Sequence, residues 1–295
     1  MKSLLPLAVF ILALAPGFSE GAEDPASVPD SALAARLNPQ SPKRLNWFIE
    51  PHRPNYVLPV SYIKNPSEKL EQQADASGAT NDFQEVEVKF QISLQLAVAE
   101  DLVAGNGDLY FAYTQIAVWQ AYNRDASSPF RDTNYEPEGY LTFDTDWDLL
   151  GLRLRMVQVG AVHQSNGRSD VLSRSWNRIY ANLILERGNF VVSVKPWYRI
   201  PEPEDEDNNP DIADYYGYGE LRTAYKWKEH VFATLMRYNF DFGDSKGALE
   251  LDWSFPLFGQ VKGFVQYFTG YGETLLDYNE SDERLGVGFL LADWI

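Results

Sequence analysis

The sequence contains no cysteine, and this absence removes several kinds of chemistry. A chain without thiols forms no disulfide, binds no zinc through thiolates and has no cysteine nucleophile. Histidine is nearly as scarce, because only three of the 295 residues are histidines. His52 and His230 have no neighbours that suggest chemistry, so we interpret them as structural or interfacial. His163 is therefore the candidate catalytic imidazole.

Basic residues are few relative to acidic ones, with 25 Lys and Arg against 42 Asp and Glu and a net charge of −17. A chain with this balance offers no basic face to a phosphate backbone, which argues against nucleic acid as a partner. Acidic loops instead suit Ca²⁺. Beyond the N-terminus the sequence also lacks an uninterrupted apolar run of about 18 residues, so no transmembrane helix is expected.

The first 22 residues have the features of a secretory signal peptide. Lys2 supplies a positive charge, residues 4–14 form an apolar core, and small residues follow. We expect cleavage between about Ser19 and Ala22. Residues 23–54, rich in Pro, Ser, Asp and Ala, are predicted to form an N-terminal arm of the exported protein.

Aromatic residues and strand-like alternation are abundant. Aromatics make up 14% of the chain, a content that fits the interfacial girdles of a membrane barrel and equally a Tyr-rich soluble sandwich. Residues 85–98 decide between them, because they alternate apolar and polar side chains for longer than an average soluble strand. Similar segments lie at 55–64, 109–123, 138–146, 149–165, 175–188, 189–200, 216–228, 230–240, 247–257, 259–272 and 284–295.

These segments predict an all-β fold, a twelve-stranded antiparallel transmembrane β-barrel over residues 55–295. Lipid-embedded barrels are closed and have even strand numbers because no sheet edge can face hydrocarbon. Short turns at 187–189 and 228–230 contrast with the long polar stretch 201–215, as expected for periplasmic turns and external loops. The chain ends in Ile295, whereas outer-membrane barrels usually end in an aromatic residue.

Residues 163–180, HQSNGRSDVLSRSWNRIY, carry the candidate chemistry. His163, Ser165 and Asn177 continue the apolar faces of two adjacent predicted strands, so they are expected on the lipid-facing wall. Neighbours on one face or across a strand pair lie roughly 4.5–7 Å apart, within reach of a hydrogen-bonded triad. His163 would take the proton from Ser165, which attacks an acyl carbonyl, while Asn177 fixes the imidazole tautomer.

Taken alone, a His-x-Ser followed by an Asn is a weak pattern, and ordinary strand polarity produces it often. Longer stretches add specificity: EVEVKFQISL (85–94), YTQ (113–115), SSPFRDTNYEP (127–137), VKPWY (194–198), NPDI (209–212) and GYGETLLDYN (270–279). With residues 163–180 they resemble the bacterial outer-membrane phospholipase A family, from about residue 55 to the C-terminus.

The resemblance implies a Ca²⁺-dependent outer-membrane enzyme, active as a homodimer, that hydrolyses acyl esters of phospholipids and lysophospholipids with A1 and A2 specificity. It also assigns roles beyond the triad. The family's oxyanion donor falls on the backbone N–H of Gly167. Its calcium ligands fall on the Arg168 carbonyl, the Ser173 hydroxyl and Ser127 from a second subunit; a monomer-type calcium site falls on Asp170 and Asp207; and a polar dimer-interface residue falls on Gln115.

Two alternatives belong to other classes. The first is a non-catalytic outer-membrane barrel, a small porin or a structural protein that keeps the scaffold. The second is a soluble secreted lipase, which is disfavoured because the sequence has no G-x-S-x-G nucleophile elbow. Filled triad positions favour the phospholipase.

Overall fold

A computed structural model of the protein describes residues 49–64 and 83–295, apart from residues 126 and 170. The predicted signal peptide and most of the predicted arm lie outside the described residues. Among the described residues no helix is long and apolar enough to cross a membrane, and α3 (Ile212–Tyr216) has only five residues.

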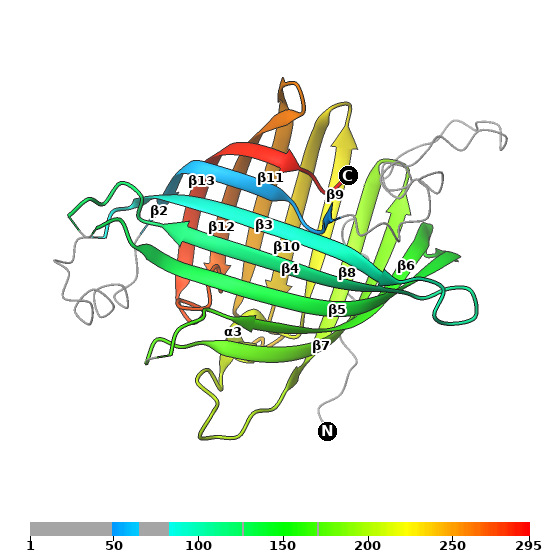
Figure 1. The fold of residues 1–295 in the computed structure, drawn as a ribbon, viewed down its shortest axis with the longest axis horizontal. Coiled ribbons are helices and arrows are strands. Elements are labelled where there is room, and N and C mark those ends of the chain that lie inside the picture. The colour runs from blue at the N-terminus through cyan, green and yellow to red at the C-terminus, as the bar shows by residue number, and fades with distance from the viewer. Residues whose placement is uncertain (1–48, 65–82, 126, 170) are drawn as a thin grey trace.

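Twelve antiparallel strands form a closed wall, because each strand pairs with the next and β13 pairs with β2 (Figure 1). This confirms the predicted fold class. The wall strands are β2 (Asn55–Ile63), β3 (Val86–Ala99), β4 (Asp108–Trp119), β5 (Phe130–Leu149), β6 (Leu152–Ser165), β7 (Ser175–Arg187), β8 (Phe190–Ile200), β9 (Gly219–Trp227), β10 (His230–Tyr238), β11 (Gly247–Phe258), β12 (Val261–Tyr271) and β13 (Ser281–Ala292).

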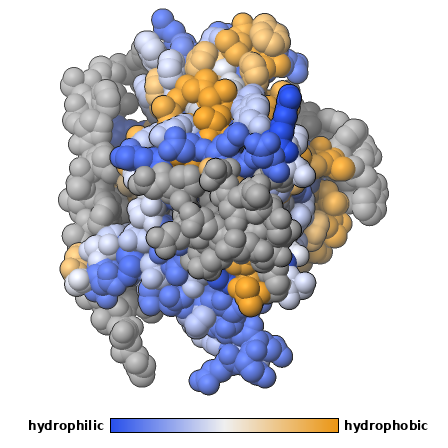
Figure 2. All heavy atoms as spheres, turned by 90° about the vertical axis from the view of Figure 1, so that its left-hand side faces the viewer, coloured by the Kyte–Doolittle hydropathy of each residue, from blue (hydrophilic) through white to orange (hydrophobic). Residues whose placement is uncertain are grey.

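The polar side chains of the wall point into the barrel and the apolar ones point out. In β3, Glu87 and Lys89 are buried in the lumen, while Ile92 and Val98 are 45% and 46% exposed on the outer face. In Figure 2 hydrophobic residues form patches in the upper half of this face, where a row of hydrophilic residues crosses them, and hydrophilic residues gather at the bottom. This inside-out pattern matches a barrel whose wall contacts lipid.

Turn lengths alternate as the sequence predicts. Two-residue connections join β7 to β8 and β11 to β12, and Gly188 and Gly259 adopt φ of +56° there. Such left-handed residues match the twist of tight hairpins. Long connections at the opposite end hold residues 166–174 and 201–218. The two ends of the barrel therefore differ, and the candidate site lies at the long-loop end.

Two wall segments differ from their predicted bounds. β5 starts at Phe130 instead of near residue 138, because charged residues such as Arg131 and Glu136 point into the lumen and find partners there. The last strand ends at Ala292. Beyond it, Asp293 accepts a hydrogen bond from Lys262 Nζ (2.8 Å), and Ile295 packs against buried apolar side chains of the lumen.

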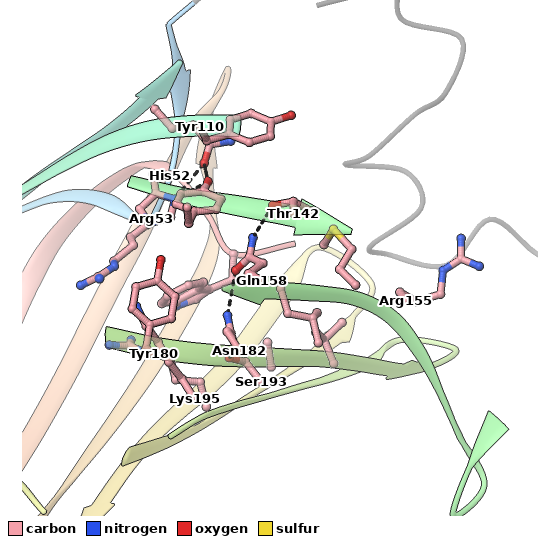
Figure 3. Close-up of a pocket in the computed structure, with 18 of the residues that line it drawn as sticks. His52, Arg53, Tyr110, Thr142, Arg155, Gln158, Tyr180, Asn182, Ser193 and Lys195 are labelled. Atoms are coloured by element: carbon pink, nitrogen blue, oxygen red, sulfur yellow. Dashed lines mark hydrogen bonds between the residues drawn. The ribbon is translucent and has the colours of Figure 1, made fainter. Parts of the chain in front are cut away.

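The lumen also contains a cavity of about 570 Å³, and the C-terminal residues Trp294 and Ile295 form part of its lining. Side chains from β5, β6, β7 and β8 point into it (Figure 3). His52 and Arg53, which follow β1 (Glu50–Pro51), reach the same space, where His52 Nε2 lies 2.8 Å from Glu138 Oε1. This contact joins His52 to β5, and the residues lining the cavity include none of the proposed triad.

Candidate functional site

The hairpin of β6 and β7 brings two triad candidates directly opposite each other. His163 pairs with Asn177 across the hairpin, and His163 Nδ1 lies 2.9 Å from Asn177 Oδ1. An amide oxygen can only accept, so Nδ1 carries the proton and donates. Nε2 is then the free basic nitrogen, which is the tautomer a general base needs.

The hairpin also decides which way these side chains point. Within β7, Trp176 and Arg178 are buried in the lumen, whereas Ile179 is 49% exposed on the outer face. Asn177 therefore shares the outer face with Ile179, and His163 is likewise exposed on β6. The candidate residues lie on the outside of the barrel, as predicted.

Ser165 lies two residues beyond His163, at the end of the same face of β6. It is half-buried and pairs with Tyr135 on one side and Ser175 on the other. In the described part of the chain no hydrogen bond joins the Ser165 hydroxyl to the His163 ring. Catalytic hydrogen bonds are often long without substrate, so the lack of a Ser165–His163 hydrogen bond is compatible with a nucleophile and its base.

Asn166 organises the loop that follows Ser165, and sequence reasoning missed it. Its buried amide donates to the Leu172 carbonyl (2.8 Å) and accepts from the Arg174 N–H (3.0 Å). Its oxygen also accepts, more weakly, from the Arg168 N–H (3.4 Å). One side chain thereby ties Arg168, Leu172 and Arg174 together. An Asn beside the proposed nucleophile was the available signal, since Asn side chains commonly bond nearby loop backbone.

Gly167, the predicted oxyanion donor, adopts a backbone conformation that few other residues tolerate. Its φ is +67°, and a Cβ built there would lie 2.8 Å from the Tyr135 ring. Both facts favour glycine.

The predicted calcium ligands are divided between two places. Arg168 and Ser173 lie together in the loop that Asn166 holds, and Ser173 Oγ accepts a hydrogen bond from Asn208 (3.1 Å). A carbonyl and a hydroxyl are hard oxygen donors of the kind Ca²⁺ prefers. Ser127 lies in the separate β4–β5 connection, exposed and with φ of +60°. The described residues contain no cluster of three His, Asp or Glu suited to a metal.

Of the two residues predicted for the second calcium site, the structure describes only Asp207. Asp170 lies outside the described residues. Asp207 is engaged by protein groups, because its Oδ1 accepts from Arg199 (2.6 Å) and from the Asn209 N–H (3.1 Å). Its assignment to a calcium site stays a prediction, and a cation there would have to compete with Arg199.

Gln115 lies on the outer face of β4, where it accepts a hydrogen bond from the Tyr113 hydroxyl (3.0 Å). It pairs with Ile92 of β3 in a region where Ile92 and Phe111 are exposed. A polar side chain on an apolar outer wall suits a position that is covered by another protein surface.

Comparisons with known proteins identify the family of this chain. The family profile described as Phospholipase A1 matches residues 34–291, which is most of the chain. The chain belongs to the phospholipase A1 family. The Phospholipase A1 of Klebsiella pneumoniae is 40% identical to this family member over 247 residues, which span 84% of this chain and 83% of that protein.

Solved structures of the family share the fold. A Salmonella typhi outer membrane phospholipase dimer with bound calcium matches with a TM-score of 0.78 and 38% identity, over 85% of this chain and 95% of that chain. An Escherichia coli outer membrane phospholipase A, with an active-site asparagine replaced by alanine, has the same score at 37% identity, over 91% and 100%. The closed barrel and these relatives place this phospholipase A1 family member in the outer membrane.

Proposed function

We propose that the protein hydrolyses the acyl esters of phospholipids and lysophospholipids with a Ser165–His163–Asn177 triad on the outer wall of the barrel. The observation that carries this proposal is the 2.9 Å contact between His163 Nδ1 and Asn177 Oδ1, with Ser165 on the same face. An active-site asparagine in the Escherichia coli relative supports the role of Asn177. Substrate would reach the site from the surrounding lipid without entering the lumen.

The reaction follows from the free Nε2 of His163. This nitrogen removes the proton from Ser165 Oγ as the oxygen attacks the ester carbonyl, and the Gly167 N–H donates to the developing oxyanion. His163 then returns the proton to the departing alcohol, which leaves an acyl-Ser165. Water, deprotonated by His163, releases the fatty acid and restores the hydroxyl. Asn177 holds the ring throughout but contributes no charge.

Calcium would be held by the Arg168 carbonyl, the Ser173 hydroxyl and Ser127 of a second copy of the chain. When bound, Ca²⁺ would supply positive charge to the oxyanion and so offset a neutral Asn177, which stabilises the imidazolium less than an aspartate would. The Salmonella typhi relative, a dimer with bound calcium, supports both parts of this arrangement. A ligand taken from a partner would make activity depend on homodimerisation through the wall around Gln115.

Removal of calcium tests the proposal at the level of the whole enzyme. Purified protein in detergent is expected to release fatty acid from phospholipid with Ca²⁺ and to lose at least about 90% of that rate in EDTA, because one removed oxyanion contact typically costs 10²–10³-fold. Activity should return when Ca²⁺ is added back in excess. Fatty-acid release that is equal in Ca²⁺ and EDTA would contradict the calcium assignment.

Replacement of Asn166 tests the loop that carries Arg168 and Ser173. Asn166→Ala removes the side chain that fixes this loop, so we expect the Ca²⁺ concentration for half-maximal activity to rise by about tenfold, the effect of one or two lost hydrogen bonds. The matched control is Asn239→Ala. Asn239 holds the β10–β11 loop in the same way, through Asp244 and Lys246, but contacts neither candidate ligand. Equal calcium curves for both variants would refute the role of Asn166.

A further inference from the structure

The amide of Asn177 is held from both sides. Its Oδ1 accepts from His163, and its Nδ2 donates to Glu202 Oε1 over 2.8 Å. The amide is therefore a bridge between an imidazole and a carboxylate. Sequence reasoning assigned no role to Glu202, which is 25 positions away from Asn177 in the chain.

The position of Glu202 follows from the register of β8. Ile200 pairs with Asn177, and Tyr198 and Ile200 are exposed on the outer face at 60% and 39%. Glu202 lies two residues beyond Ile200, so it continues the outward-facing positions of this strand past its end. Pro201 and Pro203 flank it, and their rings restrict the backbone on both sides. The carboxylate is thus presented towards Asn177 by a stiff segment that continues an otherwise apolar stripe.

Two arginines of this end of the barrel are engaged by other groups. Arg199 donates to Asp207 (2.6 Å), and Arg168 donates to the Arg131 carbonyl (3.1 Å). No ion pair in the described ranges involves Glu202, and its side chain is only half-exposed. A half-buried carboxylate without an ion pair is costly, so its bond to Asn177 calls for an explanation.

We infer that Glu202 is a positioning residue that acts on His163 through Asn177. This inference rests on the proposed function. The carboxylate only accepts hydrogen bonds, so it holds the Asn177 NH₂ on its own side and turns Oδ1 towards His163. Donation to an anion also polarises the amide and makes Oδ1 a stronger acceptor. The negative charge lies one amide away from the ring and favours the imidazolium that forms in each proton transfer. Glu202 thereby supplies part of the charge that an aspartate would bring to the Asn177 position.

The test compares Glu202→Ala and Glu202→Gln with Glu204→Gln in the full-length protein. Glu202→Ala removes both the acceptor and the charge, so kcat should fall about tenfold, the worth of one charge-assisted hydrogen bond, while KM stays unchanged. Glu202→Gln keeps an acceptor oxygen and should recover part of that loss. Glu204→Gln removes the same charge from an exposed residue of the same loop and should match the parent protein.

The kinetic parameters separate positioning from a general loss of structure. Partial recovery of kcat in Glu202→Gln with KM unchanged follows the acceptor oxygen, which a folding defect would not do. A raised KM with unchanged kcat in both Glu202 variants would overturn the inference.

The effect of Glu202→Gln on kcat should change sign in a second background, Asn177→Asp. Asn177→Asp puts a carboxylate next to the ring, where it faces the Glu202 carboxylate at hydrogen-bond distance. In that background Glu202→Gln removes a repulsion and supplies a donor, so it should raise kcat instead of lowering it. The same fractional loss in both backgrounds would refute the inference. If the parent protein releases fatty acid and all Glu202 variants equal it, this inference fails and the proposed function stands. If the parent shows no Ser165-dependent release, the proposed function itself fails.

Discussion

Fatty-acid release is expected to fall by at least about 10³-fold when Ser165 is replaced by alanine, because loss of a nucleophile removes the covalent route and leaves only binding and oxyanion contacts. The variant should fold normally. Ser165 holds its place through backbone pairing with Tyr135 and Ser175, and its half-buried hydroxyl forms no hydrogen bond with the described residues. Release from phospholipid by detergent-solubilised protein in saturating Ca²⁺ measures the effect.

The control for Ser165→Ala is Ser175→Ala. The two serines pair with each other across the hairpin, so the second variant loses the same hydroxyl at the same level of the barrel. It should keep nearly full activity. A serine-directed phosphonate should label the parent protein and Ser175→Ala but not Ser165→Ala. If Ser165→Ala retained parental activity, the triad would be wrong; if no variant and no parent were active, the non-catalytic barrel would be the better interpretation.

The second large effect concerns stability. Arg131→Met is expected to lower the free energy of unfolding by about 3–5 kcal/mol, because it removes a buried cation that pairs with two buried carboxylates, of which Glu87 keeps only Arg284 (2.9 Å). Arg131 Nε donates to Glu87 (2.9 Å), and its guanidinium also pairs with Asp277. All three side chains are at most 1% exposed. Urea unfolding of the refolded barrel, followed by tryptophan fluorescence, gives the free energy.

Lys64→Met is the matched control for the stability effect. Lys64 pairs with Glu283 over 2.8 Å, but these side chains are 60% and 43% exposed. Water screens an exposed pair, so its loss should cost no more than about 1 kcal/mol. A cost for Arg131→Met no larger than that for Lys64→Met would show that the lumen is hydrated enough to screen charges, and the account of the lumen would have to change.

Local pattern was sufficient for the fold because a lipid-facing wall imposes a strict rule. Every second side chain of a strand such as β3 must be apolar, and the alternation is visible without any tertiary information. The first residues of β5 were not predicted as a strand, because alternation is the only local signal and it is weak there. Its inward residues, including Arg131 and Glu136, are charged and read as loop until their partners on other strands are known.

The candidate site could likewise be predicted only in part from the sequence. His163, Ser165 and Asn177 are close in sequence and lie on one hairpin, so strand periodicity and family resemblance were enough to select them. Nothing local identifies Glu202, since its contact with Asn177 depends on the register of β8 against β7 and on the course of the chain beyond Ile200. Asn166 was similarly hidden, because a loop asparagine has many possible partners.

The sequence by itself determined the export signal that we predict, the closed barrel, the inside and outside of its wall, and the three residues proposed for catalysis. Each of these depends on periodicity or on neighbours within one hairpin. Only the tertiary structure decided how the lumen charges are paired, where the C-terminal residues pack and which carboxylate contacts Asn177. Those contacts join residues far apart in the chain, and the free energy that selects them comes from packing and electrostatics between strands, which no local pattern encodes.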